Sequence, residues 1–125
     1  MIEDVKLLLK VADEDLEHAN EDYKKKKYRY ACYFAQQAVE KYLKAYLLYK
    51  EGNYPFKHSI SYLIKECAEI DEDFEYLFEI GSHKLNKYYT GTRYLPLLDI
   101  SEEEAKEAIE IAEKVRNFVL KKLES

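Results

Sequence analysis

The sequence is poor in the residues that usually interrupt secondary structure. Its 125 residues include three Gly and two Pro, against roughly nine and six at average usage. A sandwich or barrel of many short strands needs more turn residues than these. With 47% hydrophobic residues the chain has enough apolar content to exclude disorder. The composition therefore predicts an all-α protein, and we expect residues 1–125 to form one domain.

Cysteine and long apolar runs are also scarce. Cys32 and Cys67 match neither a zinc-binding pair nor a redox C-x-x-C motif, so we expect both to be small core residues. The longest stretch without a charged side chain, Tyr30 to Val39, is far shorter than the ~20 residues of a membrane span. The amino end is acidic and does not resemble a secretory signal. We expect a cytoplasmic protein, and its Lys- and Glu-rich composition is of the kind reported for thermophiles.

The net charge of −5 excludes the broad basic surface of a general nucleic-acid binder. Two segments depart from this acidic average. Residues 24–50 contain eight basic residues and one acidic residue, and residues 82–98 contain three basic residues and no acidic one. Residues 1–23 carry eight acidic and two basic residues, so the first two helices should attract each other. Any phosphate site should lie on the second helix or near residues 82–98.

Apolar residues recur at steps of three and four through most of the chain, which is the period of an amphipathic helix. The apolar face of the second expected helix is the widest. This width predicts a central helix that contacts several others. The expected helices span residues 2–23, 28–50, 59–70, 72–88 and 101–123, with a long loop at 89–100.

Local motifs mark the helix ends. Gly52 has the position of a left-handed cap, and Pro55 prevents the second helix from continuing. Ser101 and Glu104 have capping-box spacing at the start of the last helix. Gly81 should loosen the helix expected at 72–88.

Three separated motifs resemble the HEPN domain family. They are the run AQQAVEKYLKAYL at 35–47, His58 at the start of the third helix, and TGTRY at 90–94. The resemblance implies an antiparallel up-and-down bundle of four main helices plus a short helix. It also implies a homodimer and a function in nucleotide binding. Many relatives are ribonuclease toxins paired with a small nucleotidyltransferase, and others are noncatalytic.

The ribonuclease motif of that family is incomplete in this chain. Arg116 and Asn117 match its first half, and they are weak catalytic candidates. The histidine that should follow is replaced within Lys121–Leu123. Without it, a ribonuclease would need Tyr89, Tyr94 or a shifted lysine for proton transfer, and lysine has an ordinary pKa near ~10.4.

Anion binding is the chemistry that the remaining residues favour. Gly91 allows the backbone to approach a ligand, Arg93 can contact phosphate, and tyrosine rings can stack on a base. The alternative is that the tyrosines pack in the core, Arg93 pairs with a carboxylate, and the lysines of the second helix are solvated. The predicted nucleotide- or anion-binding residues are Lys41, Lys44, Lys84, Lys87, Tyr89, Thr92 and Arg93.

The remaining ionisable pairs do not predict a metal or cofactor. Glu14 and His18, like Glu79 and His83, are four residues apart, but a dimetal bundle needs repeated Glu-x-x-His pairs. We expect His58 to cap or pack the third helix.

The sequence thus predicts a noncatalytic nucleotide- or partner-binding protein. The resemblance implies a second copy and a nucleotidyltransferase-like protein as partners, in a toxin–antitoxin-like pair. A ribonuclease with a displaced proton-transfer residue and a purely structural dimer are the alternatives. RNA is a less favoured ligand than a nucleotide.

Overall fold

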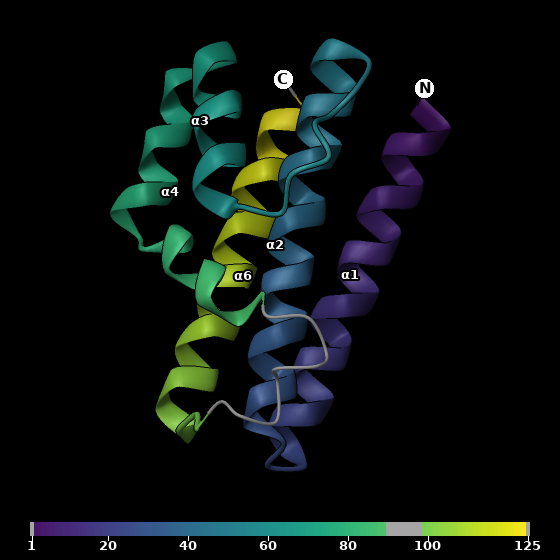
Figure 1. Ribbon diagram of the computed structural model, residues 1–125. Helices are drawn as coiled ribbons and strands as arrows, with labels where there is room; N and C mark the ends of the chain where they lie inside the picture. The colour runs from purple at the N-terminus through teal and green to yellow at the C-terminus, as the bar shows by residue number, and fades with distance from the viewer. Residues whose placement is uncertain (1, 90–98, 125) are drawn as a thin grey trace.

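The computed structural model describes residues 2–89 and 99–124 (Figure 1). All regular secondary structure in these ranges is helical, as the composition predicted. The elements are α1 (Ile2–Lys24), α2 (Tyr28–Glu51), α3 (Ile60–Ile70), the 3₁₀ segment η1 (Glu72–Glu75), α4 (Tyr76–Glu79), the 3₁₀ segment η2 (Ser82–Tyr88) and α6 (Glu102–Glu124).

The bundle is built around α2, as its wide apolar face predicted. In Figure 1, α1 lies against one side of α2 as an antiparallel hairpin, and α3, α4 and α6 lie on the other side. Contacts join α2 to α1, α6, α3 and η2. Small side chains allow the long helices to approach closely. The alanines at most 1% exposed on these helices are Ala12, Ala19, Ala31, Ala35, Ala38, Ala45, Ala105, Ala108 and Ala112.

Because α2 is covered on several sides, some of its polar side chains are buried as well as its apolar ones. Tyr42 and Tyr46 are among the largest fully buried side chains of the protein. Gln36, Glu40 and Lys44 are buried on the same helix. Because a buried polar group is costly without a hydrogen-bond partner, each of them needs a partner from a neighbouring residue.

The helix ends follow the predicted caps. Gly52 adopts a left-handed conformation with φ 82°, and its N–H donates to the Leu48 carbonyl oxygen at 2.9 Å. The Glu104 N–H donates to Ser101 Oγ at 3.1 Å, and the Ser101 N–H donates to Glu104 Oε1 at 3.5 Å. The capping box at the start of α6 is therefore confirmed.

The helix expected at 72–88 is not continuous, which corrects the prediction. It is divided into η1, α4 and η2, and Gly81 lies between the last two with φ 81°. A left-handed residue cannot continue a right-handed helix. Glycine here therefore ends one segment and begins another, a stronger effect than the loosening that we predicted.

Of the two roles expected for His58, cap or packing residue of the third helix, the capping role is wrong. The N-cap of α3 is Ser59, whose Oγ accepts a hydrogen bond from the Tyr62 N–H at 3.2 Å. A hydroxyl at this position is a favoured cap, and the His58 side chain is engaged elsewhere.

Both cysteines are fully buried, as predicted. Burial raises the pKa of the Cys32 thiol to about 12, and it raises that of Cys67 as well. None of the described helices has a stretch that is both long and apolar enough to cross a membrane.

Candidate functional site

A buried carboxylate on α2 organises the candidate site. Glu40 Oε2 accepts a hydrogen bond from Lys44 Nζ at 2.9 Å and lies 3.0 Å from His58 Nδ1. Gln36 Nε2 donates to the other oxygen, Oε1, at 3.3 Å. The Glu40 and Lys44 side chains are only 7% and 8% exposed, so this ion pair is shielded from solvent.

The hydrogen bonds continue from Gln36 toward α1. Gln37 Nε2 donates to Gln36 Oε1 at 2.6 Å, and Lys41 Nζ donates to Gln37 Oε1 at 3.5 Å. Lys41 Nζ also forms an ion pair with Asp15 on α1. This pair is one direct contact between the acidic first helix and the basic second helix. We call the connected residues the Glu40 network: Asp15, Gln36, Gln37, Glu40, Lys41, Lys44 and His58.

His58 forms the exposed end of this network. Its ring stacks on the ring of Tyr89, with centroids 4.4 Å apart and planes 20° apart. The His58 side chain is 50% exposed and Tyr89 is 40% exposed, so the ring pair meets solvent. Burial raises the pKa of the Tyr33 phenol, and the nearby Tyr89, Asp15 and Glu40 side chains raise it further. A third aromatic ring therefore lies near the network.

Asn86 holds η2 against the first turn of α3. Its Oδ1 accepts from the Ile60 N–H at 2.5 Å, and its Nδ2 donates to Ser61 Oγ at 3.1 Å. The Tyr89 N–H donates to the Asn86 carbonyl oxygen at 3.0 Å. These bonds fix the end of η2 close to residue 58, and so they position Tyr89 for its contact with His58.

The geometry gives His58 a defined chemical capacity. Its Nδ1 faces the buried Glu40 carboxylate, which favours a proton on that nitrogen. Within the described residues, no hydrogen bond engages Nε2. A carboxylate that orients imidazole in this way leaves the second nitrogen able to accept or donate a proton.

The structure brings three of the predicted site residues into one region. Lys41 and Lys44 belong to the Glu40 network, and Tyr89 stacks on its exposed end. Both lysines already pair with carboxylates, which lowers their capacity to neutralise a phosphate. Thr92 and Arg93 lie outside the described residues.

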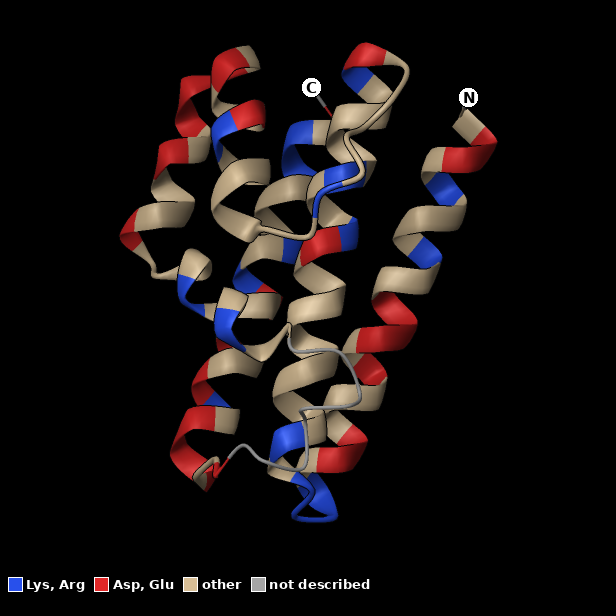
Figure 2. Cartoon of the chain, viewed as in Figure 1, with Lys and Arg blue, Asp and Glu red and all other residues tan. Residues whose placement is uncertain are grey.

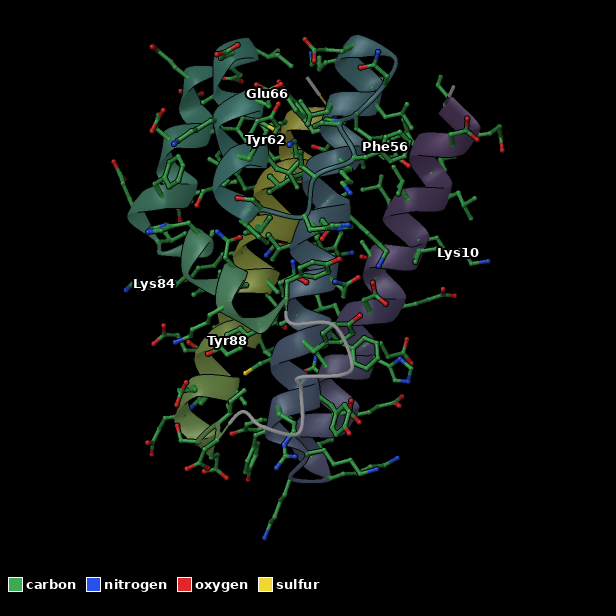
Figure 3. The ribbon with its side chains drawn as sticks, viewed as in Figure 1. Lys10, Phe56, Tyr62, Glu66, Lys84 and Tyr88 are labelled. Atoms are coloured by element: carbon green, nitrogen blue, oxygen red, sulfur yellow. The ribbon has the colours of Figure 1, made fainter. Side chains whose placement is uncertain are left out.

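The two lysines of η2 are exposed. Lys87 Nζ lies 3.8 Å from Glu104 Oε2 and 5.3 Å from the centre of the Tyr88 ring. Lys84 extends outward from the body of the protein, whereas Tyr88 points inward (Figure 3). Lys84 is therefore separate from the Glu40 network.

Arg116, the weak catalytic candidate, joins three helices. Its Nε donates to Asp13 Oδ1 at 2.9 Å, and the Tyr42 hydroxyl donates to the same oxygen. Its Nη1 donates to Asn117 Oδ1 at 3.4 Å. The hydrogen bond to Asp13 raises the pKa of Arg116, while burial and Asp13 raise that of Tyr42. This arrangement is that of a structural tie between α1, α2 and α6.

The three histidines contact residues other than Arg116. The His18 ring stacks on Phe34 with centroids 4.5 Å apart, and the His83 ring lies 5.3 Å from Phe78. His58 contacts Glu40 and Tyr89. Over residues 2–89 and 99–124, the hydrogen bonds of Arg116 involve Asp13 and Asn117. No group of three or more metal-ligating side chains occurs in these ranges.

Sequence reasoning missed the pairing of Glu40 with His58. One sign of it was present, because Gln36 and Glu40 are four residues apart on a helix whose surroundings are apolar. Polar residues at that spacing share one helix face. The sequence did not identify His58, 18 residues beyond Glu40, as the partner.

The comparisons with known proteins agree with this architecture. The model of the HEPN domain matches residues 5–123, so the chain belongs to the HEPN family. No curated protein matches the chain.

Two crystal structures are similar over almost their full lengths. TT1696 from Thermus thermophilus is 31% identical, with a TM-score of 0.74. The alignment covers 94% of this chain and 97% of that one. ST0689, described as an archaeal HEPN homologue, is 29% identical with a TM-score of 0.67, and the alignment covers 94% and 96% of the two chains.

The burial of the Glu40 network predicts the effect of removing its charge. Changing Glu40→Gln leaves the Lys44 ammonium buried without a counter-ion, so we expect unfolding free energy to fall by about 3 kcal/mol. Urea denaturation measures this loss. The double variant Glu40→Leu with Lys44→Met, which removes both charges, should recover most of it. A single-variant loss below about 1 kcal/mol, the range of exposed pairs, would contradict the assignment.

Proposed function

We propose that this HEPN protein is a nucleotide-binding module whose ligand binds at the His58–Tyr89 ring pair. The single observation that carries the proposal is this half-exposed ring pair, held from behind by the buried Glu40 network. Aromatic rings with one open face are general platforms for nucleobases. His58 Nε2 offers a polar contact to the same ligand.

The neighbouring sequence supplies groups suited to phosphate. Thr92 and Arg93 follow Tyr89 by three and four residues. Arginine binds phosphate through paired N–H donors. Lys41 and Lys44 have a different role in this proposal: they balance Asp15 and Glu40, and so they support the ring pair.

Calorimetry with AMP, ATP, GTP and UTP tests the binding site. We expect heat with at least one nucleotide, and Tyr89→Ala should weaken its affinity roughly 5- to 150-fold, because one stacked base contributes about 1–3 kcal/mol. Tyr89→Phe keeps the ring and should retain binding. Arg93→Ala should also weaken it. Tyr76→Ala, which removes an equally exposed tyrosine on α4, serves as the control. Absence of heat with every nucleotide would reject the proposal.

A ribonuclease is the second candidate, and the Glu40–His58 contact favours it. His58 would be the displaced proton-transfer residue: its Nε2 would accept the proton of a ribose 2′-hydroxyl as that oxygen attacks the adjacent phosphorus. The 5′-oxygen would leave with a proton from water, which gives a 2′,3′-cyclic phosphate. The half-exposed position of His58 allows this contact with substrate.

Incubation with a labelled RNA separates the two functions. If the protein is a ribonuclease, the products should have cyclic-phosphate ends. The His58→Ala variant should lose this activity while its circular dichroism spectrum shows that the fold is retained. RNA that stays intact between pH 5 and 9 would reject the ribonuclease function, and nucleotide binding would be the remaining candidate. Cleavage that persists in His58→Ala would exclude His58 as the proton acceptor.

Of the two partners implied by the family, the described surface supports a second copy of the chain. Phe56 is 93% exposed and Leu7 is 58% exposed. Leu7 is one of the residues that line a hollow of about 330 Å³, with Asp4, Leu8, Val11, Leu48 and Tyr54. The Phe56 ring lies 6.3 Å from that of Tyr54. A projecting ring beside an apolar hollow suits a twofold contact in which each copy fills the hollow of the other. The nucleotidyltransferase-like partner stays a prediction from the family.

Light scattering during size-exclusion chromatography, which measures the molar mass of the eluting protein, tests this contact. We expect the mass of a dimer for the unmodified chain and the mass of a monomer for Phe56→Asp, because a buried unpaired carboxylate is costly. Phe56 is almost fully exposed in one chain, so its replacement should leave the fold intact. Ile70→Asp, at the end of α3, should remain dimeric. An unmodified monomer would refute the contact.

A further inference from the structure

Four consecutive lysines form the turn between α1 and α2. We call Lys24, Lys25, Lys26 and Lys27 the basic tip. All four are exposed, and they form the blue end of the helical hairpin in Figure 2. None of these ammonium groups has an ion pair within the described ranges, and residues 90–98 contain no Asp or Glu. An acidic protein thus carries four adjacent lysines, without ion pairs among the described residues, at one end.

Hydrogen bonds hold the backbone of this turn against the end of α1. Its backbone N–H groups at Lys25, Lys26 and Lys27 donate to carbonyl oxygens of the last turn of α1, at 3.1, 3.0 and 2.8 Å. Lys26 has φ 62°, and it is the only non-glycine residue with positive φ in the described ranges. A left-handed lysine costs roughly 1–2 kcal/mol, whereas glycine or asparagine fits there readily.

Folding alone therefore does not account for the composition of this turn. Adjacent like charges repel each other, and the left-handed backbone conformation is occupied by Lys26, a residue type that disfavours it. Stability would favour a short polar turn with glycine. A ligand that needs several cations side by side gives the lysines a role.

The surroundings indicate what kind of anion fits. Aromatic residues interleave with the cations, and Tyr30 is 40% exposed. A hollow of about 250 Å³ adjoins the tip and is lined by Lys26, Lys27, Tyr28, Arg29, Tyr30, Asp99 and Ile100. Cations beside exposed rings are the combination that binds the phosphates and bases of single strands. An acidic peptide would gain nothing from the rings beyond ordinary apolar contact.

Acidic surfaces limit the size of this ligand. Glu14, Glu17 and Glu21 lie along α1 beside His18. On the other side, the Tyr28 hydroxyl donates to Glu102 at 2.9 Å, which brings the acidic start of α6 close to the tip. A wide duplex would approach these carboxylates, whereas one strand can contact the tip alone. At physiological salt, charges more than about 8 Å away are largely screened.

We propose that the basic tip binds the phosphate backbone of single-stranded nucleic acid, with a base stacked on Tyr30. This site is separate from the His58–Tyr89 ring pair and does not depend on the proposed function. It gives the protein a strand-binding end in addition to its nucleotide site.

Fluorescence anisotropy with labelled twelve-residue oligo(U) and oligo(dT) tests the proposal. If the four lysines contact phosphates, log affinity should fall with log salt at a slope of about −2.8, and affinity should weaken roughly 50-fold between 50 and 200 mM salt. Changing Lys25→Gln and Lys27→Gln together should reduce the slope to about −1.4. Lys106→Gln with Lys114→Gln, which removes two exposed charges from α6, should leave the slope unchanged.

Two further variants separate binding from folding and from the other site. Lys26→Gly relieves the backbone strain, so it should raise the melting temperature while it weakens binding. Tyr89→Ala removes no cation, so it should leave the salt slope of strand binding unchanged. Three results would overturn the proposal: no binding at 50 mM salt, equal slopes for the tip and α6 variants, or loss of strand binding in Tyr89→Ala alone. Competition by a polyglutamate peptide as strong as by the unlabelled strand would assign the tip to acidic proteins instead.

Discussion

The position of α2 at the centre of the bundle is the constraint on which the rest of the structure depends. Because α1, α6, α3 and η2 all pack on it, even its polar side chains leave water. A buried carboxylate is tolerated only when it is paired and hydrogen-bonded. Glu40 meets this condition through Lys44, Gln36 and His58. The same requirement that stabilises the core therefore holds a histidine in a fixed orientation at the surface.

The two groups of lysines within residues 24–50 consequently serve different purposes. Lys41 and Lys44, in the middle of the helix, are matched by Asp15 and Glu40. The lysines that precede the helix have no such partners among the described residues. The net positive charge of residues 24–50 combines these two groups. Only the structure separates the charge that balances the Asp15 and Glu40 carboxylates from the charge that is open to a ligand.

Arg116 illustrates how packing can give a motif residue another role. The guanidinium is paired with Asp13, which also accepts the hydrogen bond of buried Tyr42. An arginine held in this way links three helices. His58, the histidine that contacts the Glu40 carboxylate, lies just before α3 instead of following Arg116 on α6.

Local sequence predicted the parts of the fold that depend on neighbouring residues. The stripes of apolar residues, the Gly52 cap and the Ser101–Glu104 capping box all act over a few positions, and the structure has each of them. Prediction from local sequence failed where one local preference outweighed another. Periodicity favoured a continuous helix over 72–88, but the left-handed backbone at Gly81 divides it. At the start of α3, the hydroxyl of Ser59 caps the helix, which was one of the two roles expected for His58.

The sequence by itself determined the all-helical class, the central place of α2 and the family. Tertiary structure decided the site, because partners far apart in the chain are chosen by how helices pack. Glu40 and His58 are separated by 18 residues, and Asp13 and Arg116 by 103. A helical period specifies which face of a helix is buried, but it does not specify which polar group on the neighbouring element lies opposite.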